Sequence, residues 1–177
     1  MTSTLYTRTD GPLGAMLLVG RVADGGRVVL RSLSLEGQKG AAVVEDGWVR
    51  ADGAFEEAVE QLGAYFAGRR DGFDLPYDEE SGTEFQRRVW RALDEIPYGT
   101  TVSYGEIARR IGSPGAGVRA VGTAIGRNPL LVVRPCHRVI GADGSLRGYA
   151  AGLDRKEWLL GLEGALERPL PAGRSRA

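Results

Sequence analysis

Apolar and polar residues alternate in the first third of the chain and then take up a helical period. Residues 13–19 and 27–34 have the pattern of two strands, and the Ala-Asp-Gly-Gly run at 23–26 is typical of a hairpin turn. Apolar residues next recur every three or four positions over 54–67, which predicts an amphipathic helix. Its apolar stripe consists of Phe55, Val59, Leu62 and Phe66. We therefore expect a small α/β unit, followed at 68–80 by an aperiodic, extended link.

The second half predicts helices from their start signals. A hydroxyl or carboxylate residue followed three positions later by Glu or Gln is a capping box, and this signature occurs at Thr83, Ser103 and Asp154. The first of these helices has a predicted apolar face, made by Phe85, Val89, Trp90 and Leu93. We expect one helix to begin at each signature.

The helix that begins after Ser103 is short and is followed by a second one. Gly112 is placed to end the first helix, Ser-Pro-Gly at 113–115 predicts a turn, and a further helix is expected over 118–126. Helix, tight turn and helix fit a helix-turn-helix, and residues 130–133 with a turn at 142–145 add the pattern of a winged helix. Two helices packed in an ordinary core would produce the same pattern.

The helix over 118–126 is almost bare of bulky side chains. Its small residues are Ala116, Gly117, Ala120, Gly122, Thr123 and Ala124, counting the two that precede it. Something must approach its backbone closely, either another helix or a nucleic-acid groove into which Arg119 projects.

Composition separates the two halves of the chain. The 177 residues are 42% hydrophobic, which suits one domain of ordinary size or two small ones. The net charge is zero, but up to Glu80 there are 8 basic and 14 acidic residues, and beyond it 15 basic and 9 acidic ones. The basic half suggests a surface that faces a polyanion. Two solvated surfaces of unremarkable bias are the alternative.

The only cysteine, Cys136, directly precedes the only histidine, His137. A thiol reacts as the thiolate, and we expect the imidazole and the cations Arg134 and Arg138 to lower its pKa. A buried structural cysteine beside a surface histidine is the alternative. One Cys and one His allow neither an intramolecular disulfide nor a four-ligand zinc site, so we expect no metal and no cofactor. The chain shows no leader and no apolar run that could span a bilayer, so we expect a reduced, cytoplasmic protein.

Several motifs in order resemble one family. Residues 83–164 closely resemble the O6-alkylguanine-DNA alkyltransferases, or methylated-DNA:protein-cysteine methyltransferases. The matching segments are Phe-Gln-Arg-Arg-Val-Trp at 85–90, Ile-Pro-Tyr-Gly at 96–99, Ser-Tyr-Gly-Glu-Ile-Ala at 103–108, Arg-Ala-Val-Gly at 119–122, Asn-Pro at 128–129, Pro-Cys-His-Arg-Val at 135–139, Gly-Tyr at 148–149 and Lys-Glu-Trp-Leu-Leu at 156–160. The N-terminal half matches more loosely.

The resemblance implies a fold and a division into domains. Residues 1–80 would form a ribonuclease-H-like α/β domain with the linker, without a direct part in the chemistry. Residues 81–166 would form a mainly α, winged helix-turn-helix domain that binds DNA and transfers the alkyl group, and 167–177 a disordered tail.

The resemblance also implies a reaction. Cys136 would attack the alkyl carbon of an O6-alkylguanine flipped out of duplex DNA, and His137 would take the thiol proton through a water. Glu163 would orient His137, although the nearer Glu157 competes for that role on sequence alone. Because a thioether is a poor leaving group, the alkyl group would stay on Cys136 and each molecule would act once. No obligate protein partner is implied, and the expected form is a monomer.

Five further residues match DNA-binding or base-binding positions of the family. Arg119 would enter the minor groove as a finger that fills the gap in the base stack. Tyr104 would crowd the phosphate beside the target nucleotide and then hydrogen-bond the flipped guanine. Asn128 would tie the recognition helix, expected over 118–126, to the segment that carries Cys136. Val139 would face the guanine edge through its backbone, and Tyr149 would lie in the binding loop.

The chain also departs from the family pattern. It has four residues between Pro114 and Arg119 where commonly known members have three. Arg134 stands where an apolar residue usually precedes Pro-Cys, so it could shift the thiol pKa or contact phosphate. Ala150 replaces a small hydroxyl residue that some members use on the leaving oxygen. The Cys and His ligands of members with N-terminal zinc are missing.

Two other functions remain compatible with these residues. A DNA-binding lesion sensor would recognise damage without transfer, although non-reactive relatives replace the cysteine that this chain keeps. A Cys-His-Glu hydrolase would need an oxyanion hole and would turn over repeatedly.

Overall fold

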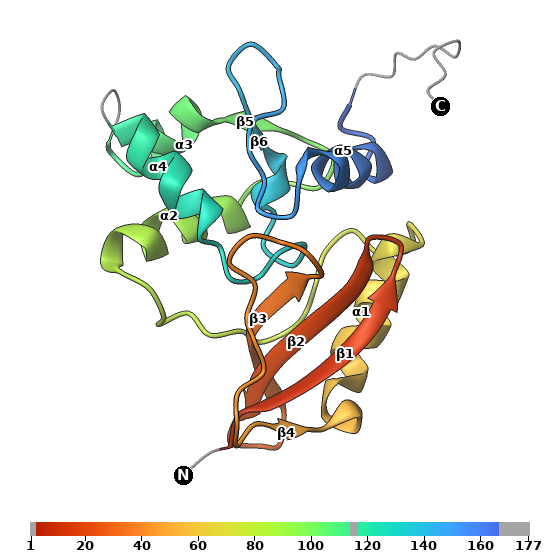
Figure 1. Cartoon of the computed structure of the whole chain (residues 1–177). Helices are drawn as coiled ribbons and strands as arrows, with labels where there is room; N and C mark the ends of the chain where they lie inside the picture. Colours follow the sequence, from red (N-terminus) through yellow and green to blue (C-terminus); the bar gives the residue numbers. More distant parts are fainter. Residues whose placement is uncertain (1–2, 114–116, 167–177) are drawn as a thin grey trace.

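The computed structural model describes residues 3–113 and 117–166, and its N-terminal half is built on a four-stranded sheet (Figure 1). The sheet order is β3-β2-β1-β4. The strands β1 (Leu5–Gly11), β2 (Gly14–Val22) and β3 (Val28–Leu35) are antiparallel neighbours, and the short β4 (Val49–Arg50) pairs in parallel with β1. The predicted hairpin is therefore present as β2 and β3, whereas β1 and β4 were not predicted.

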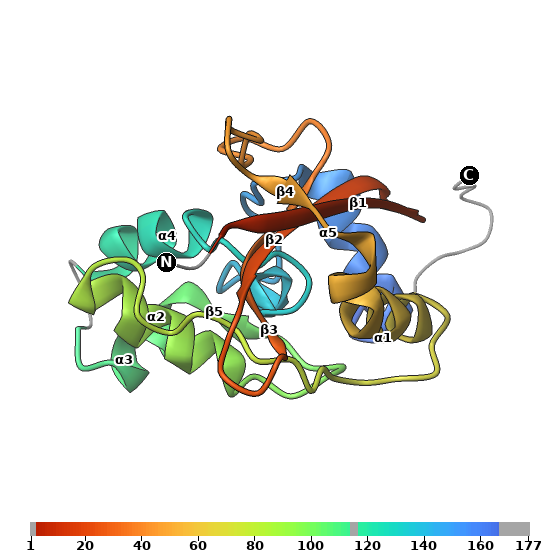
Figure 2. The same cartoon turned by 90° about the horizontal axis from the view of Figure 1, so that it is seen from below.

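A single long helix covers one face of this sheet (Figure 2). A 3₁₀ helix, η1 (Asp52–Phe55), leads into α1 (Glu56–Phe66), as the periodicity over 54–67 predicts. Leu62 and Tyr65 are fully buried on its inner side. The link at 68–80 then runs along β3, where Leu30 and Tyr77 form an isolated bridge.

The C-terminal half is mainly helical. It contains α2 (Glu84–Asp94), α3 (Tyr104–Arg110), α4 (Gly117–Gly126) and α5 (Leu153–Leu162). Two-residue strands, β5 (Val102–Ser103) and β6 (Val139–Ile140), pair in parallel, and η2 (Cys136–Arg138) precedes β6. Within the part of the chain that the structure describes, no helix is long and apolar enough to cross a bilayer.

The three predicted helix starts have different outcomes. Thr83 forms the full capping box with Gln86 at the start of α2. Ser103 caps α3, but the Glu106 carboxylate pairs with Arg109 and Arg110 instead of closing the box. The predicted start at Asp154 is wrong. Gly152, at φ 99°, turns the chain into α5 at Leu153, so Asp154 lies inside the first turn and no side chain caps this helix.

Helices α3 and α4 form the predicted helix-turn-helix. Gly112 follows α3 with φ 79°, the left-handed conformation expected of a residue that ends a helix. The turn predicted at 113–115, and the extra residue before Arg119, fall partly on 114–116, outside the described residues, as does the tail 167–177. The turn at 142–145 is present and is closed by a hydrogen bond from Gly141 N to Ser145 O at 2.8 Å.

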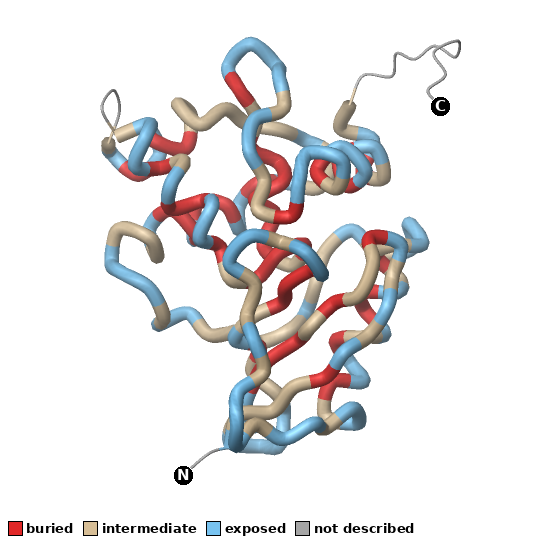
Figure 3. Tube along the Cα trace, viewed as in Figure 1, coloured by how far each residue is buried: buried red, intermediate tan, exposed pale blue. Residues whose placement is uncertain are grey.

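The two halves share one apolar core (Figure 3). The edge of β3 is joined to the C-terminal half by backbone hydrogen bonds from Leu33 N to Pro129 O at 2.9 Å and from Leu131 N to Leu33 O at 3.2 Å. These bonds hold the segment 130–134 against the edge of the N-terminal sheet. This joint fixes the position of the segment that carries Cys136.

Candidate active site

Cys136 lies at the end of a tightly wound segment that Asn128 holds together. The Asn128 side-chain oxygen accepts from Leu130 N at 3.0 Å, and its amide nitrogen lies within hydrogen-bonding distance of Arg134 O at 3.3 Å. The same nitrogen donates to Cys136 Sγ at 3.1 Å. Asn128 thus ties the end of α4 to the sulfur, and being 3% exposed it is shielded from competing water.

Backbone strain is concentrated in the same segment. Val132 has φ 72°, the only left-handed non-glycine residue among those that the structure describes. A β-branched side chain is costly in this conformation, so the surrounding contacts must enforce it. A bond from Val133 N to Leu131 O at 2.8 Å closes a three-residue turn around Val132. Cys136 follows four residues later, at the start of η2, and lines a cavity.

His137 is fully buried and is bonded to Glu163, which lies just after α5. The distance between His137 Nε2 and Glu163 Oε2 is 2.9 Å. When Nε2–H donates to the carboxylate, Nδ1 is left as the basic nitrogen, and Nδ1 has no hydrogen-bond partner among the described residues. Glu157, the competing acid, is exposed on α5. The structure therefore brings Glu163, not Glu157, to the imidazole.

The Glu163 carboxylate accepts from two more side chains. Arg138 donates from Nε at 2.8 Å to one oxygen and from Nη2 at 2.9 Å to the other. The hydroxyl of Tyr65, on α1 of the N-terminal half, donates to the oxygen that His137 also contacts. Although burial opposes ionisation, hydrogen bonds from His137, Arg138 and Tyr65 keep the pKa of Glu163 far below its ordinary value. Glu163 is therefore an anion that holds His137 without taking its proton.

The thiol is protonated at rest, which corrects the expectation from sequence. Cys136 is 3% exposed, and burial raises its pKa to about 11 despite the Asn128 hydrogen bond and the charges of Lys156 and Arg134. Arg138 does not act on the thiol as predicted, because its guanidinium is bonded to Glu163 and to Ile96 O. Burial also lowers the pKa of His137, although Glu163 acts in the opposite direction. Burial therefore favours the neutral forms of both the thiol and the imidazole.

Lys156 is a cation that the sequence analysis did not single out. Its side chain is buried and donates to Arg147 O at 3.0 Å and to Gly148 O at 3.2 Å. Burial lowers the pKa of Lys156 to about 8, whereas the proximity of Cys136 favours its charged form. Its position in the Lys-Glu-Trp-Leu-Leu segment at 156–160 is the available signal, but that segment supports only the resemblance and gives Lys156 no role.

Arg134 is a structural cation and does not face solvent. Its guanidinium is 5.0 Å from the ring centre of Tyr77 and 5.3 Å from that of Trp90, and its Nε donates to Asp94 at 3.2 Å. The residue is 3% exposed. Arg134, which departs from the family pattern, therefore joins the link and α2 to the segment that carries Cys136. Its charge also acts to lower the pKa of the Cys136 thiol.

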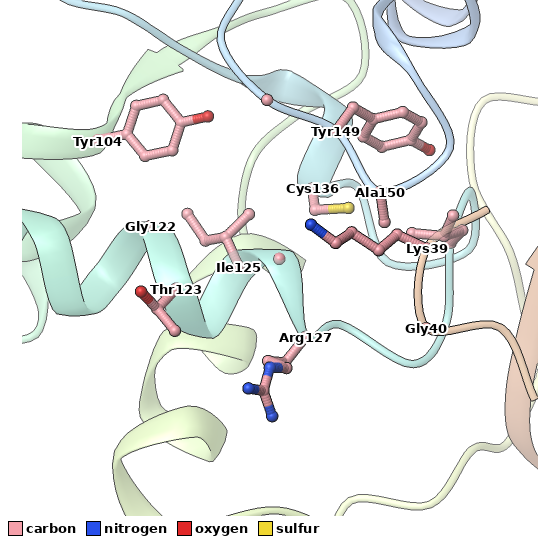
Figure 4. A pocket seen from close by; sticks show the side chains of 13 residues that line it. Lys39, Gly40, Tyr104, Gly122, Thr123, Ile125, Arg127, Cys136, Tyr149 and Ala150 are labelled. Carbon is pink, nitrogen blue, oxygen red and sulfur yellow. The ribbon is translucent and has the colours of Figure 1, made fainter.

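A cavity of about 640 Å³ opens beside Cys136 (Figure 4). Its walls are Tyr104 from α3, the small residues of α4 around Gly122, the loop with Tyr149 and Ala150, and Lys39 from the N-terminal half. A Cβ atom at Gly122 would lie 3.9 Å from the Tyr104 ring, which is an ordinary van der Waals contact. The close approach predicted for the backbone of α4 is therefore not observed at Gly122, and this face of the helix borders the cavity instead.

The other predicted residues lie around the cavity in different places. Arg119 is exposed on α4 and borders a second, shallower cavity of about 540 Å³ with Phe85. Val139 is fully buried in β6, next to η2. Asn128 does not line the cavity and contacts Cys136 through the hydrogen bond to its sulfur. Tyr149 lines the cavity, and its hydroxyl is buried without a partner among the described residues.

These features define a class of protein, namely one with a single nucleophilic cysteine in the wall of a cavity beside a helix-turn-helix. Comparison with known families agrees with this class. Residues 84–165 match the model of the 6-O-methylguanine DNA methyltransferase DNA binding domain, and residues 4–78 match that of the ribonuclease-like domain of the same proteins. The chain belongs to the 6-O-methylguanine DNA methyltransferase family.

Individual relatives are similar along most of the chain. The methylated-DNA–protein-cysteine methyltransferase of Mycolicibacterium paratuberculosis is 54% identical over 158 residues, 89% of this chain and 91% of the relative. That of Methanosarcina acetivorans is 51% identical over 160 residues, 90% and 98% of the two chains. The crystal structure of Mycobacterium tuberculosis OGT in complex with DNA superposes with a TM-score of 0.79 at 48% identity, covering 91% of this chain and 93% of that one.

Proposed function

We propose that this chain repairs O6-alkylguanine in duplex DNA by moving the alkyl group irreversibly to its own Cys136. The observation that carries the proposal is the Cys136 sulfur in the wall of an open cavity, backed by a buried His137–Glu163 pair. The family relationship and the DNA-bound relative support the same reaction. We assign DNA binding and alkyl transfer to residues 81–166, and the ribonuclease-like domain with its link to residues 1–80.

Recognition begins at the helix-turn-helix. Arg119 is exposed on α4, the second helix of the pair, in the basic half of the chain. A long planar cation there can enter the minor groove and occupy the space of a displaced base. Flipping costs a few kcal/mol, and least for a lesion that pairs poorly. The flipped base then enters the cavity between Tyr104 and Tyr149, beside the backbone of Val139.

Transfer requires the thiol to lose its proton as it attacks. With a pKa of about 11, Cys136 is neutral until a base acts on it, and His137 Nδ1 is the free basic nitrogen in the buried network. The sulfur forms a bond to the alkyl carbon while the bond from that carbon to O6 breaks. Glu163 stabilises the imidazolium that forms, and Lys156 the negative charge that develops on sulfur. The guanine leaves with a proton in place of the alkyl group.

The product explains why each molecule acts once. A thioether is a poor leaving group, and Cys136 is the only cysteine of the chain, so no second thiol can attack it. A reaction that consumes a reduced thiol also favours a reducing compartment, and we infer a cytoplasmic location. Duplex DNA with O6-alkylguanine is the proposed partner, and the scheme uses no obligate protein partner.

Mass spectrometry after stoichiometric mixing with a duplex that contains one O6-methylguanine tests the proposal. We expect a lasting gain of one CH₂ unit on the Cys136 peptide, and none in Cys136→Ala, which should still bind the duplex. A lesion that stays intact while bound would indicate a sensor. Repeated cleavage of an activated ester without an adduct would indicate a hydrolase.

A further inference from the structure

Lys39 brings a cation from the N-terminal half into the cavity beside Cys136. It lies in the loop between β3 and β4, and it lines the same cavity as Cys136 and Ala150. Figure 4 shows its side chain running along the wall formed by Ala150, with the ammonium group directed to the region of the Cys136 sulfur. This half of the chain therefore contributes to the site, which the resemblance did not imply.

The backbone around Lys39 is fixed by hydrogen bonds. Lys39 N donates to Ala150 O at 3.0 Å, which joins the loop to the far half of the chain. One residue earlier, Gln38 N donates to Leu35 O at 3.0 Å and the Gln38 side chain accepts from Leu35 N at 2.7 Å. The chain therefore leaves β3 in a defined turn that presents Lys39 to the cavity.

The charges around the cavity leave this ammonium group available to a ligand. None of the described residues that line the cavity is acidic. Lys39 forms no ion pair or side-chain hydrogen bond with the described residues, whereas the Lys156 ammonium is bound by two carbonyl oxygens. Arg127 also lines the cavity, but its guanidinium is turned away from the sulfur (Figure 4).

We propose that Lys39 adapts the cavity to O6 substituents that end in a carboxylate, with O6-carboxymethylguanine as the simplest case. Attack by a sulfur that becomes negative is disfavoured when the target carbon carries a carboxylate, because the two like charges approach each other. An ammonium group near both charges offsets this repulsion in the transition state. A methyl substituent carries no charge, so with it the ammonium group acts on the sulfur alone and its effect on the rate is smaller.

The chemical step is the one already proposed, on which this inference rests. A bond forms between Cys136 Sγ and the methylene carbon, the bond from that carbon to O6 breaks, and the thiol proton ends on the guanine. The carboxylate is unchanged, and the product is an S-carboxymethyl cysteine. No oxidant, reductant or further reactant is required.

Three duplexes of one sequence separate charge from size. They carry O6-methylguanine, O6-carboxymethylguanine or its neutral amide analogue, O6-carbamoylmethylguanine, and single-turnover transfer rates are measured for each. The variants are Lys39→Met, which keeps the stem and removes the charge, Lys39→Arg, which restores a cation, and Arg127→Met, which removes a cation from the same cavity.

We expect Lys39→Met to slow transfer from the carboxymethyl duplex about fivefold to tenfold. This is the effect on the rate expected from the loss of one partly solvated interaction between two charges. Rates for the methyl and carbamoylmethyl duplexes should stay within about twofold of wild type, and Lys39→Arg should restore most of the loss. Arg127→Met should affect all three duplexes alike.

An equal effect of Lys39→Met on the carboxymethyl and carbamoylmethyl duplexes, or no effect on either, would overturn the inference. If the wild-type chain fails to take even the methyl group, the proposed function itself fails and the inference with it. Efficient methyl transfer without dependence of the carboxymethyl rate on Lys39 refutes only the role of Lys39.

Discussion

At the scale of single residues, the chemistry depends on how one buried carboxylate is shared. Glu163 accepts from His137, Arg138 and Tyr65, so it stays ionised while fully enclosed. Removing one donor from such a group leaves an unmet hydrogen bond in a low-dielectric site. Tyr65 is the donor that does not belong to the C-terminal half, and we assign it a positioning role.

Tyr65→Phe should slow alkyl transfer about tenfold, the equivalent of roughly 1.4 kcal/mol for one buried hydrogen bond. The Tyr65 hydroxyl lowers the pKa of Glu163 and Glu163 raises that of His137, so its removal should raise the His137 pKa. In wild type, burial holds the His137 pKa below its ordinary 6.5, so the rate should fall only in more acidic solution. In the variant this fall should move to higher pH. Rate against pH, with DNA affinity measured in parallel, checks both effects.

A matched control is Tyr6→Phe, a tyrosine on β1 away from the cavity. It should leave both the rate and its pH dependence unchanged. A Tyr65→Phe protein with the wild-type pH profile and rate would show that the hydroxyl only contributes to packing.

The reacting residues can be predicted from the sequence more completely than the residues that surround and position them. Adjacency singles out Cys136 and His137, and the family pattern favours Glu163 over Glu157. Tyr65 and Lys39 could not be found in this way, because their partners lie 98 and 111 positions further along the chain and only the docking of the two halves brings them together. The sequence does not predict the raised pKa of the Cys136 thiol, because it shows the neighbouring charges but not the burial of the thiol.

At the scale of elements, the periodic segments were predicted and the short ones were not. Helix α1 and strands β2 and β3 follow from their hydrophobic patterns. Strand β1 carries polar Thr, Arg and Asp residues and so lacks a clear apolar face, and β4, β5 and β6 have two residues each, too few for a period. Helix α5 begins earlier than its carboxylate signal because a glycine conformation sets its start. The packing of α2 on the active-site segment depends on a residue, Arg134, whose role the sequence left open.

Arg134→Ala should destabilise the fold by about 2–3 kcal/mol, because it removes a buried cation from two aromatic rings and from Asp94. Urea unfolding measures this loss. The dependence of DNA affinity on salt should be unchanged, since the guanidinium is 3% exposed and cannot reach phosphate. A smaller salt slope with normal stability would instead identify Arg134 as a phosphate contact.

At the scale of the whole molecule, an acidic half and a basic half share one core. The N-terminal half holds Lys39 and Tyr65 against the site, and the C-terminal half carries the helix-turn-helix and the thiol. A basic surface that binds phosphates releases counterions, so affinity for duplex should weaken as salt is added. We propose that this arrangement separates two tasks, extraction of the base at α4 and transfer of the alkyl group in the cavity.

Arg119→Ala should separate these two tasks. Repair of a lesion in duplex DNA should fall by at least about tenfold, because the gap in the base stack is no longer filled. Reaction with free O6-benzylguanine, which needs no flipping, should change by less than about twofold. Rates for the two substrates, measured side by side, provide the check, and an equal loss on both would contradict the proposed role.

The most direct test of the central claim is a titration of the number of lesions repaired by each protein molecule. A fixed amount of the chain is mixed with a growing excess of O6-methylguanine duplex, and restored guanine is counted at completion. The account predicts a plateau at one lesion per molecule, with Cys136 methylated in every molecule. Repair that continues beyond one lesion per molecule, or that leaves Cys136 unmodified, would contradict it.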